Sequence, residues 1–432
     1  MAGDSRPFGE LFAEPTRNGL TRPKAVRGDG VKMVNMGELF AHPRLRNAQM
    51  DRVPLSQSES ERFLLKEGDL LFARQSLVLE GAGKCSIFLG DDEAVTFESH
   101  VTRVRLDPTK ADPCFYFYYL QSHHGRAAIR SIVEQGAGAS GIRGSDLESL
   151  DVLWRPLPEQ RAIAHILGTL DDKIELNRRM NETLEAMARV LFKSWFVDFD
   201  PARAKAEGRD PGLPKSLADL FPARLVDSEL GEVPEGWVVK PLDEIARFLN
   251  GLALQKYPPT GERSLPVIKI AQLRAGTTDG ADRASVDLEP AYIVQNGDIL
   301  FSWSGSLECV MWAAGPGALN QHLFKVTSDQ YPKWLCYLGV HHHLEDFRHI
   351  AAGKATTMGH IQRHHLSEAK LATPSQALLK AMDVVFAPIV ESTWRRALEA
   401  RTLAALRDTL LPRLISGELR VEDTERFVGV AL

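Results

Sequence analysis

The alternation of apolar and polar residues predicts short strands at matching places in the two halves of the chain. VKMVNMGEL (Val31–Leu39) and VIKIAQL (Val267–Leu273) both follow the alternating pattern of a half-buried strand. Further along, GDLLF beginning at Gly68 reappears as GDILF beginning at Gly297, in each case a turn that feeds a strand. These matches predict an internal repeat.

The repeat extends over most of the chain. The tripeptide Asn-Gly-Leu at Asn18 recurs at Asn250, and HVTRVRL at His100 parallels HLFKVTS at His322. Both halves continue into an aromatic, helix-like segment, FYFYYLQ and KWLCYLG, and then into a small-residue loop, QGAGASGIRGSDL and AGKATTMGHIQRHHL. Each half is therefore predicted to be a globular domain followed by a long helix.

The first long helix is predicted after Pro158, a residue suited to the first helical position. Apolar positions then alternate steps of four and three, as in a coiled coil, over roughly 38 residues or about 60 Å. The alternative is an ordinary core helix with two exposed asparagines, but a rod of this length needs a partner of similar length. The predicted seam positions are Ile163, Leu167, Leu170, Ile174, Asn177, Asn181, Leu184, Ala188, Leu191 and Trp195.

The second long helix supplies that partner. Polar residues interrupt its apolar spacing, Pro388 is expected to kink it, and Pro412 is expected to end or bend its last turn. If the two helices pack antiparallel, they form a spacer between the two globular domains. Residues 200–237, rich in Pro, Gly and charge, are predicted to be an ordered connector with one short helix. The predicted seam positions are Leu379, Met382, Phe386, Ile389, Thr393, Ala400, Leu403, Leu410 and Leu414.

Composition and charge restrict the function classes. The net charge of −5 is unfavourable for binding nucleic acid, since phosphate neutralisation needs a basic surface. Positive groups must then be local, or a partner must supply phosphate contacts. The four cysteines form no CxxC pair and lie in or beside apolar runs, which predicts reduced and mostly buried thiols. The absence of a long apolar stretch and of a signal-like start predicts a cytoplasmic location without a membrane partner.

The residues resemble one known family. The run LPEQRAIAHILGTLDDKIELNRRMNETLEAMARVLFKSWFVDFDPARAKAEGRDPGLP (Leu157–Pro214) is similar to the central conserved region of type I restriction-modification specificity subunits. RTLAALRDTLLPRLISGEL (Arg401–Leu419) resembles their distal conserved region. With the duplicated GD(L/I)LF turns, the resemblance covers essentially the whole chain.

The resemblance implies an α+β fold: two pseudo-twofold-related α/β target-recognition domains separated by a long antiparallel coiled-coil helix pair. It implies double-stranded DNA, two methyltransferase subunits and restriction/translocation subunits as partners. S-adenosylmethionine would bind the methyltransferase subunits, ATP and Mg²⁺ would bind the restriction subunit, and this chain would hold no cofactor and do no chemistry. The expected boundaries are 1–155 and 238–374 for the recognition domains, 156–199 and 375–420 for the helices, 200–237 for the connector and 421–432 for the tail.

Several motifs suggest other chemistry but lack its context. Gly136, Gly138 and Gly141 spell GxGxxG without the required strand before and helix after. The histidines around His341 and His364 form no metal-ligand spacing, so we expect no metal and interpret them as solvated or DNA-facing. No adenine-methyltransferase motif, phosphate loop or HExxH occurs. The charges Asp171-Asp172 and Arg178-Arg179 are interpreted as a solvated face of the first helix, and secondarily as a surface for docking the methylating subunit.

Candidate DNA contacts are polar residues at the divergent positions of the repeat. Arg and Lys recognise guanine, Asn and Gln recognise adenine, and hydroxyls reach phosphates. In the first domain the candidates are Lys32, Asn35, Arg74, Gln75, Ser76, Ser140 and Arg143. In the second they are Lys269, Gln272, Ser302, Trp303, Ser304, Lys354, Thr356, Thr357, His360 and Arg363.

Two rival function classes stay open at this point. One is a single chain that both recognises and modifies DNA, which the missing methyltransferase and nuclease motifs disfavour. The other is a coiled-coil scaffold that binds no nucleic acid, which the net charge favours. A scaffold leaves unexplained why the two loops at equivalent positions differ while the framework around them is kept.

Overall fold

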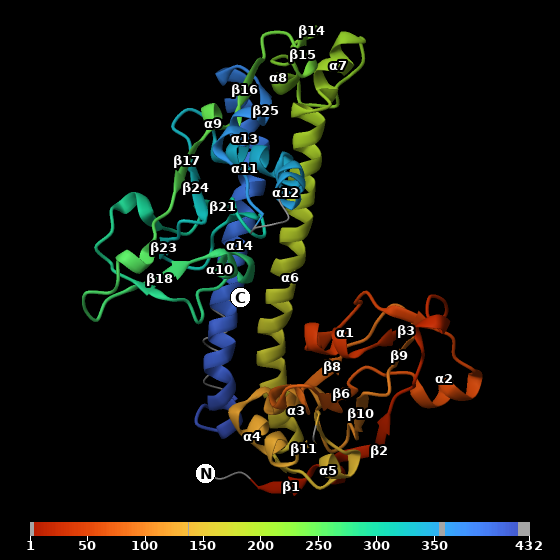
Figure 1. The fold of residues 1–432 in the computed structure, drawn as a ribbon. Coiled ribbons are helices and arrows are strands. Elements are labelled where there is room, and N and C mark those ends of the chain that lie inside the picture. Colours follow the sequence, from red (N-terminus) through yellow and green to blue (C-terminus); the bar gives the residue numbers. More distant parts are fainter. Residues whose placement is uncertain (1–3, 137, 354–358, 422–432) are drawn as a thin grey trace. The chain divides into compact units, whose positions relative to one another are not determined.

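The computed structural model describes residues 4–136, 138–353 and 359–421. It divides into two compact units (Figure 1). Unit 1 combines the chain up to residue 173 with the segment from residue 403, and unit 2 comprises residues 174–402. Each unit therefore contains one globular part together with portions of both long helices.

Unit 1 is built on a five-stranded sheet in the order β2-β10-β6-β8-β4 and on smaller sheets β5-β3-β9, β11-β12-β7 and β1-β13. Its strands are β1 (Ser5–Pro7), β2 (Phe12–Asn18), β3 (Val31–Val34), β4 (Arg44–Leu45), β5 (Asp51–Val53), β6 (Leu70–Ala73), β7 (Gln75–Ser76), β8 (Cys85–Phe88), β9 (Val95–Phe97), β10 (Val101–Leu106), β11 (Glu134–Gln135), β12 (Ser140–Gly141) and β13 (Asp151–Leu153). Its short helices are α1 (Met36–Ala41), α2 (Gln57–Phe63), α3 (Pro113–Gln121), α4 (His123–Ser131) and α5 (Gly144–Glu148).

Unit 2 repeats this plan in a four-stranded sheet, β17-β24-β21-β22, and a second sheet, β19-β18-β23-β20. Its strands are β14 (Leu225–Ser228), β15 (Gly231–Pro234), β16 (Val238–Pro241), β17 (Arg247–Asn250), β18 (Leu265–Ile268), β19 (Arg283–Ala284), β20 (Ile293–Val294), β21 (Ile299–Ser302), β22 (Cys309–Met311), β23 (Gly317–Leu319), β24 (Leu323–Thr327) and β25 (Lys370–Thr373). Its short helices are α7 (Asp200–Ala206), α8 (Lys215–Ala218), α9 (Leu242–Ile245), α10 (Ile270–Ala275), α11 (Lys333–His342), α12 (Leu344–Ala352) and α13 (Arg363–Glu368).

Strand pairing confirms the repeat. Strand β3 pairs in parallel with β9, and β18 pairs in parallel with β23, whereas the main-sheet pairs β10·β6 and β24·β21 are antiparallel. The glycines of the repeated motifs have equivalent roles. A Cβ on Gly19 would lie 2.1 Å from the Phe97 carbonyl oxygen, and one on Gly251 would lie 2.3 Å from that of Asn320. The turn glycines Gly68 and Gly297 have φ angles of 88° and 86°, which other residues rarely adopt.

In each of the two segments predicted to be a strand from alternation, only the first part is a strand and the second part is a helix. β3 ends at Val34 and α1 follows it; β18 ends at Ile268 and α10 follows it. The cause lies in the residues after each strand. The Glu38 carboxylate accepts a hydrogen bond from the Asn35 N–H (2.8 Å), and the Gln272 side chain accepts one from the Lys269 N–H (3.3 Å). Side chains that accept the N–H just before the first helical turn in this way favour the start of a helix.

The long helices α6 (Leu157–Phe196) and α14 (Gln376–Ser416) pair antiparallel within each unit. In unit 1, Arg155, just before α6, donates to the Ile415 carbonyl, and Asp171 lies 2.6 Å from Arg407. In unit 2, Trp195 packs against Phe386 with ring centroids 5.2 Å apart. As the residue number rises from 155 to 195 at the first helix, the number of its contact partner at the second falls from 415 to 386. Antiparallel packing requires this order. Pro412 was expected to end or bend the last turn; helix α14 continues past it to Ser416, so Pro412 does not end the helix.

The predicted seam positions are largely shielded from solvent. Asn177 is fully buried, whereas its neighbour Leu176, which could have covered the polar centre of the seam, is half exposed. Asp171 was interpreted as part of a solvated face, and this is wrong: it is buried and accepts hydrogen bonds from Tyr118 and Arg407. The buried seam positions are Ile163, Leu167, Leu170, Asn177, Ala188, Trp195, Leu379, Met382, Phe386, Thr393, Leu403, Leu410 and Leu414, and the partly buried ones are Ile174, Asn181, Leu184, Leu191, Ile389 and Ala400.

The connector of unit 2 contains more structure than predicted. Two short helices, α7 and α8, and the hairpin β14–β15 occupy it, in place of a single short helix, and they lie at the end of α6 that belongs to unit 2 (Figure 1). Trp237 at its end packs against Phe196 and Phe199. As predicted, Cys85, Cys309 and Cys336 are buried free thiols; Cys114 is partly buried. Within the described ranges, no helix is long and apolar enough to cross a bilayer.

Candidate nucleic-acid interface

A short β ladder joins two of the predicted contact segments in unit 1. β7, which follows the GDLLF turn, pairs with β12 of the small-residue loop, and Ser76 lies opposite Ser140. The backbone N–H of Arg74 donates to the His100 carbonyl (2.8 Å), and the Ile142 N–H donates to the Arg74 carbonyl (3.0 Å). Segments about 65 residues apart in the chain therefore form one surface.

Unit 2 builds the equivalent ladder from different side chains. The Trp303 N–H donates to the His322 carbonyl (3.3 Å), and the Ile361 N–H donates to the Trp303 carbonyl (2.9 Å). Ser304 pairs with His360 in an antiparallel bridge. Trp303, His322 and Ile361 thus have the backbone partners that Arg74, His100 and Ile142 have in unit 1. A shared backbone frame with divergent side chains suits two readers of different sequences.

The side chains of the unit 1 ladder differ in accessibility. Gln75 and Arg143 are exposed, and Arg74 is partly buried with its guanidinium 3.4 Å from the Ser99 carbonyl. Ser140 is buried, and Ser76 accepts a hydrogen bond from the Val78 N–H within its own loop. Gln75 and Arg143 therefore offer the most accessible polar groups of this ladder.

Three of the candidate cations already have carboxylate partners. Lys32 Nζ lies 2.8 Å from Asp91, and this hydrogen bond raises the lysine pKa. Arg143 lies 2.6 Å from Glu134, and Lys269 pairs with Asp282. Asn35 is similarly engaged, since its side-chain oxygen accepts from Arg27 (2.9 Å). A phosphate or base would have to replace these partners, which agrees with the net charge of −5.

Ser302 does not fit a DNA-contacting role. It is fully buried; its hydroxyl donates to the Ser306 carbonyl (2.7 Å) and accepts from the Glu308 N–H (2.8 Å). Ser304 is also buried, with its hydroxyl 3.0 Å from His322 Nδ1. These serines hold the turn between β21 and β22. The prediction failed here because alternation within a strand fully buried on both faces does not reveal which hydroxyls point inward.

Trp303 is partly buried and anchored. Its indole N–H donates to the Asn250 side chain and to the Gln321 carbonyl, both at 3.0 Å. Its ring lies 6.4 Å from that of His360. Gln272 caps α10 and is partly buried. Lys354, Thr356 and Thr357 lie outside the described residues.

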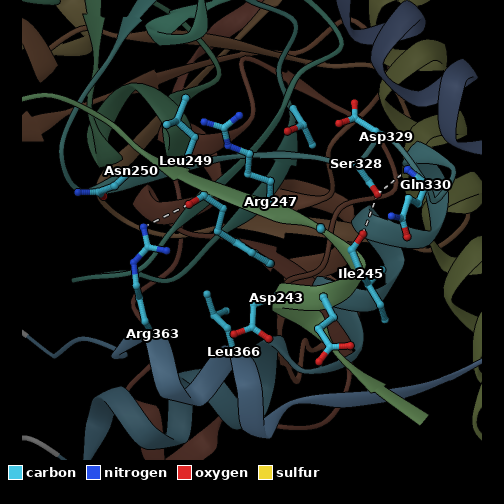
Figure 2. Close-up of a pocket in the computed structure, with 14 residues that line it drawn as sticks. Asp243, Ile245, Arg247, Leu249, Asn250, Ser328, Asp329, Gln330, Arg363 and Leu366 are labelled. Carbon is cyan, nitrogen blue, oxygen red and sulfur yellow. Dashed lines mark hydrogen bonds between the residues drawn. The ribbon is translucent and has the colours of Figure 1, made fainter. Parts of the chain in front are cut away.

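Arg363 lines a cavity of about 600 Å³ against strand β17 (Figure 2). Its guanidinium donates to the Phe248 carbonyl (3.4 Å) and lies 5.6 Å from the centre of the Phe324 ring. Arg247 and Asp243 also line the cavity, so its charge is mixed. This charge mixture and the edge position of β17 suit a polar surface contact better than an enclosed small-molecule site.

Two residues at the ladders were missed by the sequence reasoning. Gln362 occupies the N-cap position of α13, as Arg143 occupies that of α5, and it is exposed. The repeat itself carried the signal, because aligning the two small-residue loops on Ile142 and Ile361 places Gln362 beside Arg143. Leu77, directly after Ser76, is exposed over 89% of its surface, which only the structure reveals.

The histidines are not uniformly solvated as predicted. Burial lowers the pKa of His341 and of His343 to about 4, so both are neutral at pH 7. In the described chain, His364, His365 and Glu368 form the one group close enough for a metal. However, His365 Nδ1 accepts from the Gln362 N–H (2.9 Å), which places the proton on Nε2 and leaves that nitrogen unable to ligate.

Comparisons with known proteins agree with the repeat. A family model described as "Type I restriction modification DNA specificity domain" matches residues 29–186 and 234–385, one match in each half of the chain. The chain is similar to the type I restriction enzyme HindI specificity subunit of Haemophilus influenzae, with 25% identity over 411 residues, 82% of this chain and 87% of that protein. It is 26% identical over 319 residues to the type I restriction enzyme MjaIX specificity subunit of Methanocaldococcus jannaschii, covering 71% and 69% of the two chains.

A solved structure shares the fold. The crystal structure of the S subunit of a type I restriction-modification system from M. genitalium superposes with a TM-score of 0.57, covers 95% of both chains, and is 16% identical in sequence. At this identity the likeness concerns the fold alone. It agrees with two repeated α/β parts and a long helix pair.

Proposed function

Because the chain belongs to the family of type I restriction-modification DNA specificity subunits, we propose that each of its two ladders reads one half of a bipartite, asymmetric DNA site. The chain is a non-catalytic DNA-recognition component of a restriction-modification system. The observation that supports two readers is the shared backbone frame at Arg74 and Trp303, which presents different side chains in each unit.

We further propose that α6 and α14 set the separation between the two half-sites. A continuous helix rises about 1.5 Å per residue, so its length is a fixed quantity rather than a loop-dependent one. The support is that both helices are continuous, and that a hydrogen bond in unit 1 and a ring contact in unit 2 join them.

The same helices are proposed to dock two methyltransferase subunits. Leu176 and Met187 of α6 are half exposed and Val190 is 68% exposed, and the three fall within one side of the helix at 100° per residue. Exposed apolar groups on one helix side suit a protein partner, and the charged residue Arg179, on the same side of the helix, suits its polar rim. In this proposal S-adenosylmethionine binds the methyltransferase subunits, while ATP and Mg²⁺ bind a restriction subunit.

The ion pairs of the candidate cations support a dependence of this chain on its partner subunits for DNA binding. Lys32 and Arg143 each have a carboxylate within 2.8 Å, so their charge is largely compensated before DNA arrives. This chain alone is therefore proposed to grip DNA weakly and to read it well only between its methylating partners.

A domain exchange tests the two-reader proposal. Residues 1–155 are replaced by the first domain of another family member, and methylated adenines are sequenced genome-wide in cells that contain the methyltransferase partner. The expected result is a change in one half-site only. The matched control replaces residues 238–374 and should change only the other half. A change in both halves, or in neither, contradicts the proposal.

Heptad changes test the spacer. Adding seven residues to α6 and the matching seven to α14 lengthens the pair by about 10 Å. The expected result is a larger gap between unchanged half-sites, or loss of assembly with the methyltransferase subunits. If the recognised bases change while the gap stays the same, the helices do not set the spacing.

A further inference from the structure

The loop that follows Gln75 in unit 1 presents consecutive apolar side chains to solvent. Leu77 is 89% exposed and Val78 is 60% exposed, and Leu79 follows with partial exposure. Runs of exposed apolar residues are unfavourable in a folded protein unless another molecule covers them. We call Leu77 and Val78 the apolar tip.

Hydrogen bonds hold the apolar tip in one conformation. Ser76 Oγ accepts from the Val78 N–H (3.2 Å), and the Val78 carbonyl accepts from the Gly81 N–H (3.1 Å). A Cβ on Gly81 would lie 2.2 Å from Ser76 Oγ, so the loop closes tightly on itself. A fixed loop presents Leu77 at little entropic cost on binding, which favours a binding role.

The apolar tip belongs to unit 1 alone. There, the chain between β6 and β8 spans residues 74–84; in unit 2 the chain between β21 and β22 spans only residues 303–308. The apolar residue of the shorter loop, Leu307, is 2% exposed and joins the core of unit 2. The tip is therefore no requirement of the shared fold.

The neighbouring side chains indicate what covers the tip. Strand residues alternate sides, and Ser76 faces Gly81, so Gln75, its neighbour in β7, faces the opposite way. Leu77 follows directly after β7 and is exposed beside it. An exposed amide reads adenine in the major groove, and an apolar side chain contacts the thymine C5-methyl group. Gln75 can therefore contact the adenine, and Leu77 the thymine methyl group, of one A·T pair or of two adjacent pairs. The ladder that holds Gln75 is the proposed reader itself.

We propose that Leu77 and Val78 pack against thymine methyl groups in the half-site read by unit 1 and thereby determine part of its specificity. This inference rests on the proposed function, since it places DNA against the β7–β12 ladder. It gives the two readers different chemistry: unit 1 adds apolar readout to polar contacts, and unit 2 relies on polar and aromatic groups.

The test uses the full chain in complex with its methyltransferase subunits. After the half-sites are determined by modified-base sequencing, each thymine of the unit 1 half-site is replaced singly by deoxyuridine, which lacks only the methyl group. One replacement should weaken DNA binding about threefold to tenfold, the value expected for one buried methyl. Leu77→Ala should weaken binding to the thymine duplex similarly and abolish the response to that deoxyuridine.

The controls separate this inference from its alternatives. Leu230→Ala alters an exposed leucine of the β14–β15 turn and should leave DNA binding unchanged. Additive effects of Leu77→Ala and deoxyuridine, or unchanged binding of the wild type after every single deoxyuridine replacement, overturn the inference. If Leu77→Ala instead weakens assembly with the methyltransferase subunits in the absence of DNA, the tip binds protein and the inference is wrong.

The experiments distinguish failure of the proposed function from failure of the inference about the apolar tip. If exchanging residues 1–155 leaves both half-sites unchanged, unit 1 does not read DNA and both proposals are wrong. If that exchange changes one half-site while Leu77→Ala and Val78→Ala bind every duplex like the wild type, only the apolar tip is wrong. Thermal unfolding of each variant verifies that the exposed substitutions leave the fold intact.

Discussion

The side-chain amide of Asn177 on α6 donates a hydrogen bond to the carboxylate of Glu399 on α14, with the nitrogen and oxygen 3.0 Å apart. Asn177 is fully buried, and its oxygen lies 3.4 Å from an Arg396 guanidinium nitrogen. One turn later, the buried Oδ1 of Asn181 has no hydrogen-bond partner among the described residues. Two asparagines at successive seam positions of unit 2 therefore have opposite energetic roles.

Leucine substitutions at the two asparagines should have opposite effects. Asn181→Leu should raise the free energy of unfolding by about 1 kcal/mol, because it removes an unsatisfied buried oxygen and adds apolar packing. Asn177→Leu should lower it by about 1–3 kcal/mol, because it removes the amide that joins Glu399 and Arg396. Urea denaturation of both variants measures the difference. Equal effects of the same sign would show that the hydrogen bonds of Asn177 contribute nothing.

The buried carboxylate of unit 1 gives a second prediction. Asp171 accepts from Tyr118 Oη (2.7 Å) and from Arg407 (2.6 Å). Arg407→Met should destabilise the fold by about 3 kcal/mol, because a buried charge loses its counter-charge. Tyr118→Phe removes one neutral donor and should cost about 1 kcal/mol. Melting temperatures report the order, and a larger loss for Tyr118→Phe would contradict it.

Acid should destabilise unit 2 through its buried histidines. Burial is the main cause that lowers the pKa of His341 to about 4, from an ordinary value of 6.5. Between these two values the unfolded chain binds more protons than the folded chain, so stability falls as the pH drops from 6.5 toward 4. The loss should reach about 1–3 kcal/mol for this residue.

His341→Leu should flatten that pH dependence in denaturation measured from pH 7 to pH 4. It should lower stability at pH 7 only by about 1 kcal/mol, because it loses the hydrogen bond to the Cys309 backbone, while the buried Nε2 has no partner among the described residues. His349→Gln is the matched control, because the His349 side chain is exposed, with Nε2 3.9 Å from Glu345. An unchanged pH profile in His341→Leu would mean that this histidine does not titrate as the burial suggests.

The equivalent N-cap residues Arg143 and Gln362 should affect different half-sites. Arg143→Ala should relax base preference only in the half-site of unit 1, and Gln362→Ala only in that of unit 2, each by about 1–3 kcal/mol. Methylated-adenine sequencing of variant-bearing cells measures both. Ser302→Ala should destabilise the turn at Glu308 without changing any base preference, because Ser302 is buried. A change in bases on Ser302→Ala would contradict its structural role.

Most of the architecture follows from local patterns. The repeated GD(L/I)LF turns need glycine at a positive φ, and the four-three spacing of α6 needs a partner, so both were predictable from residues near one another in the chain. The end of the strand at Val34 was not predictable in this way. The residues after it keep the alternation typical of a strand, but the hydrogen bond from the Asn35 N–H to Glu38 starts a helix there.

The sequence by itself determined the repeat, the two long helices and the positions of the candidate contact segments, since each is a periodic or local property. Only the tertiary structure decided which side chains are accessible. Ser302 and Leu77 illustrate this: the hydroxyl is buried in a turn and the leucine is exposed at a loop tip, the reverse of what their polarity suggests. Accessibility depends on residues distant in the chain, such as Ser140 opposite Ser76, and such pairings form only when the whole domain folds.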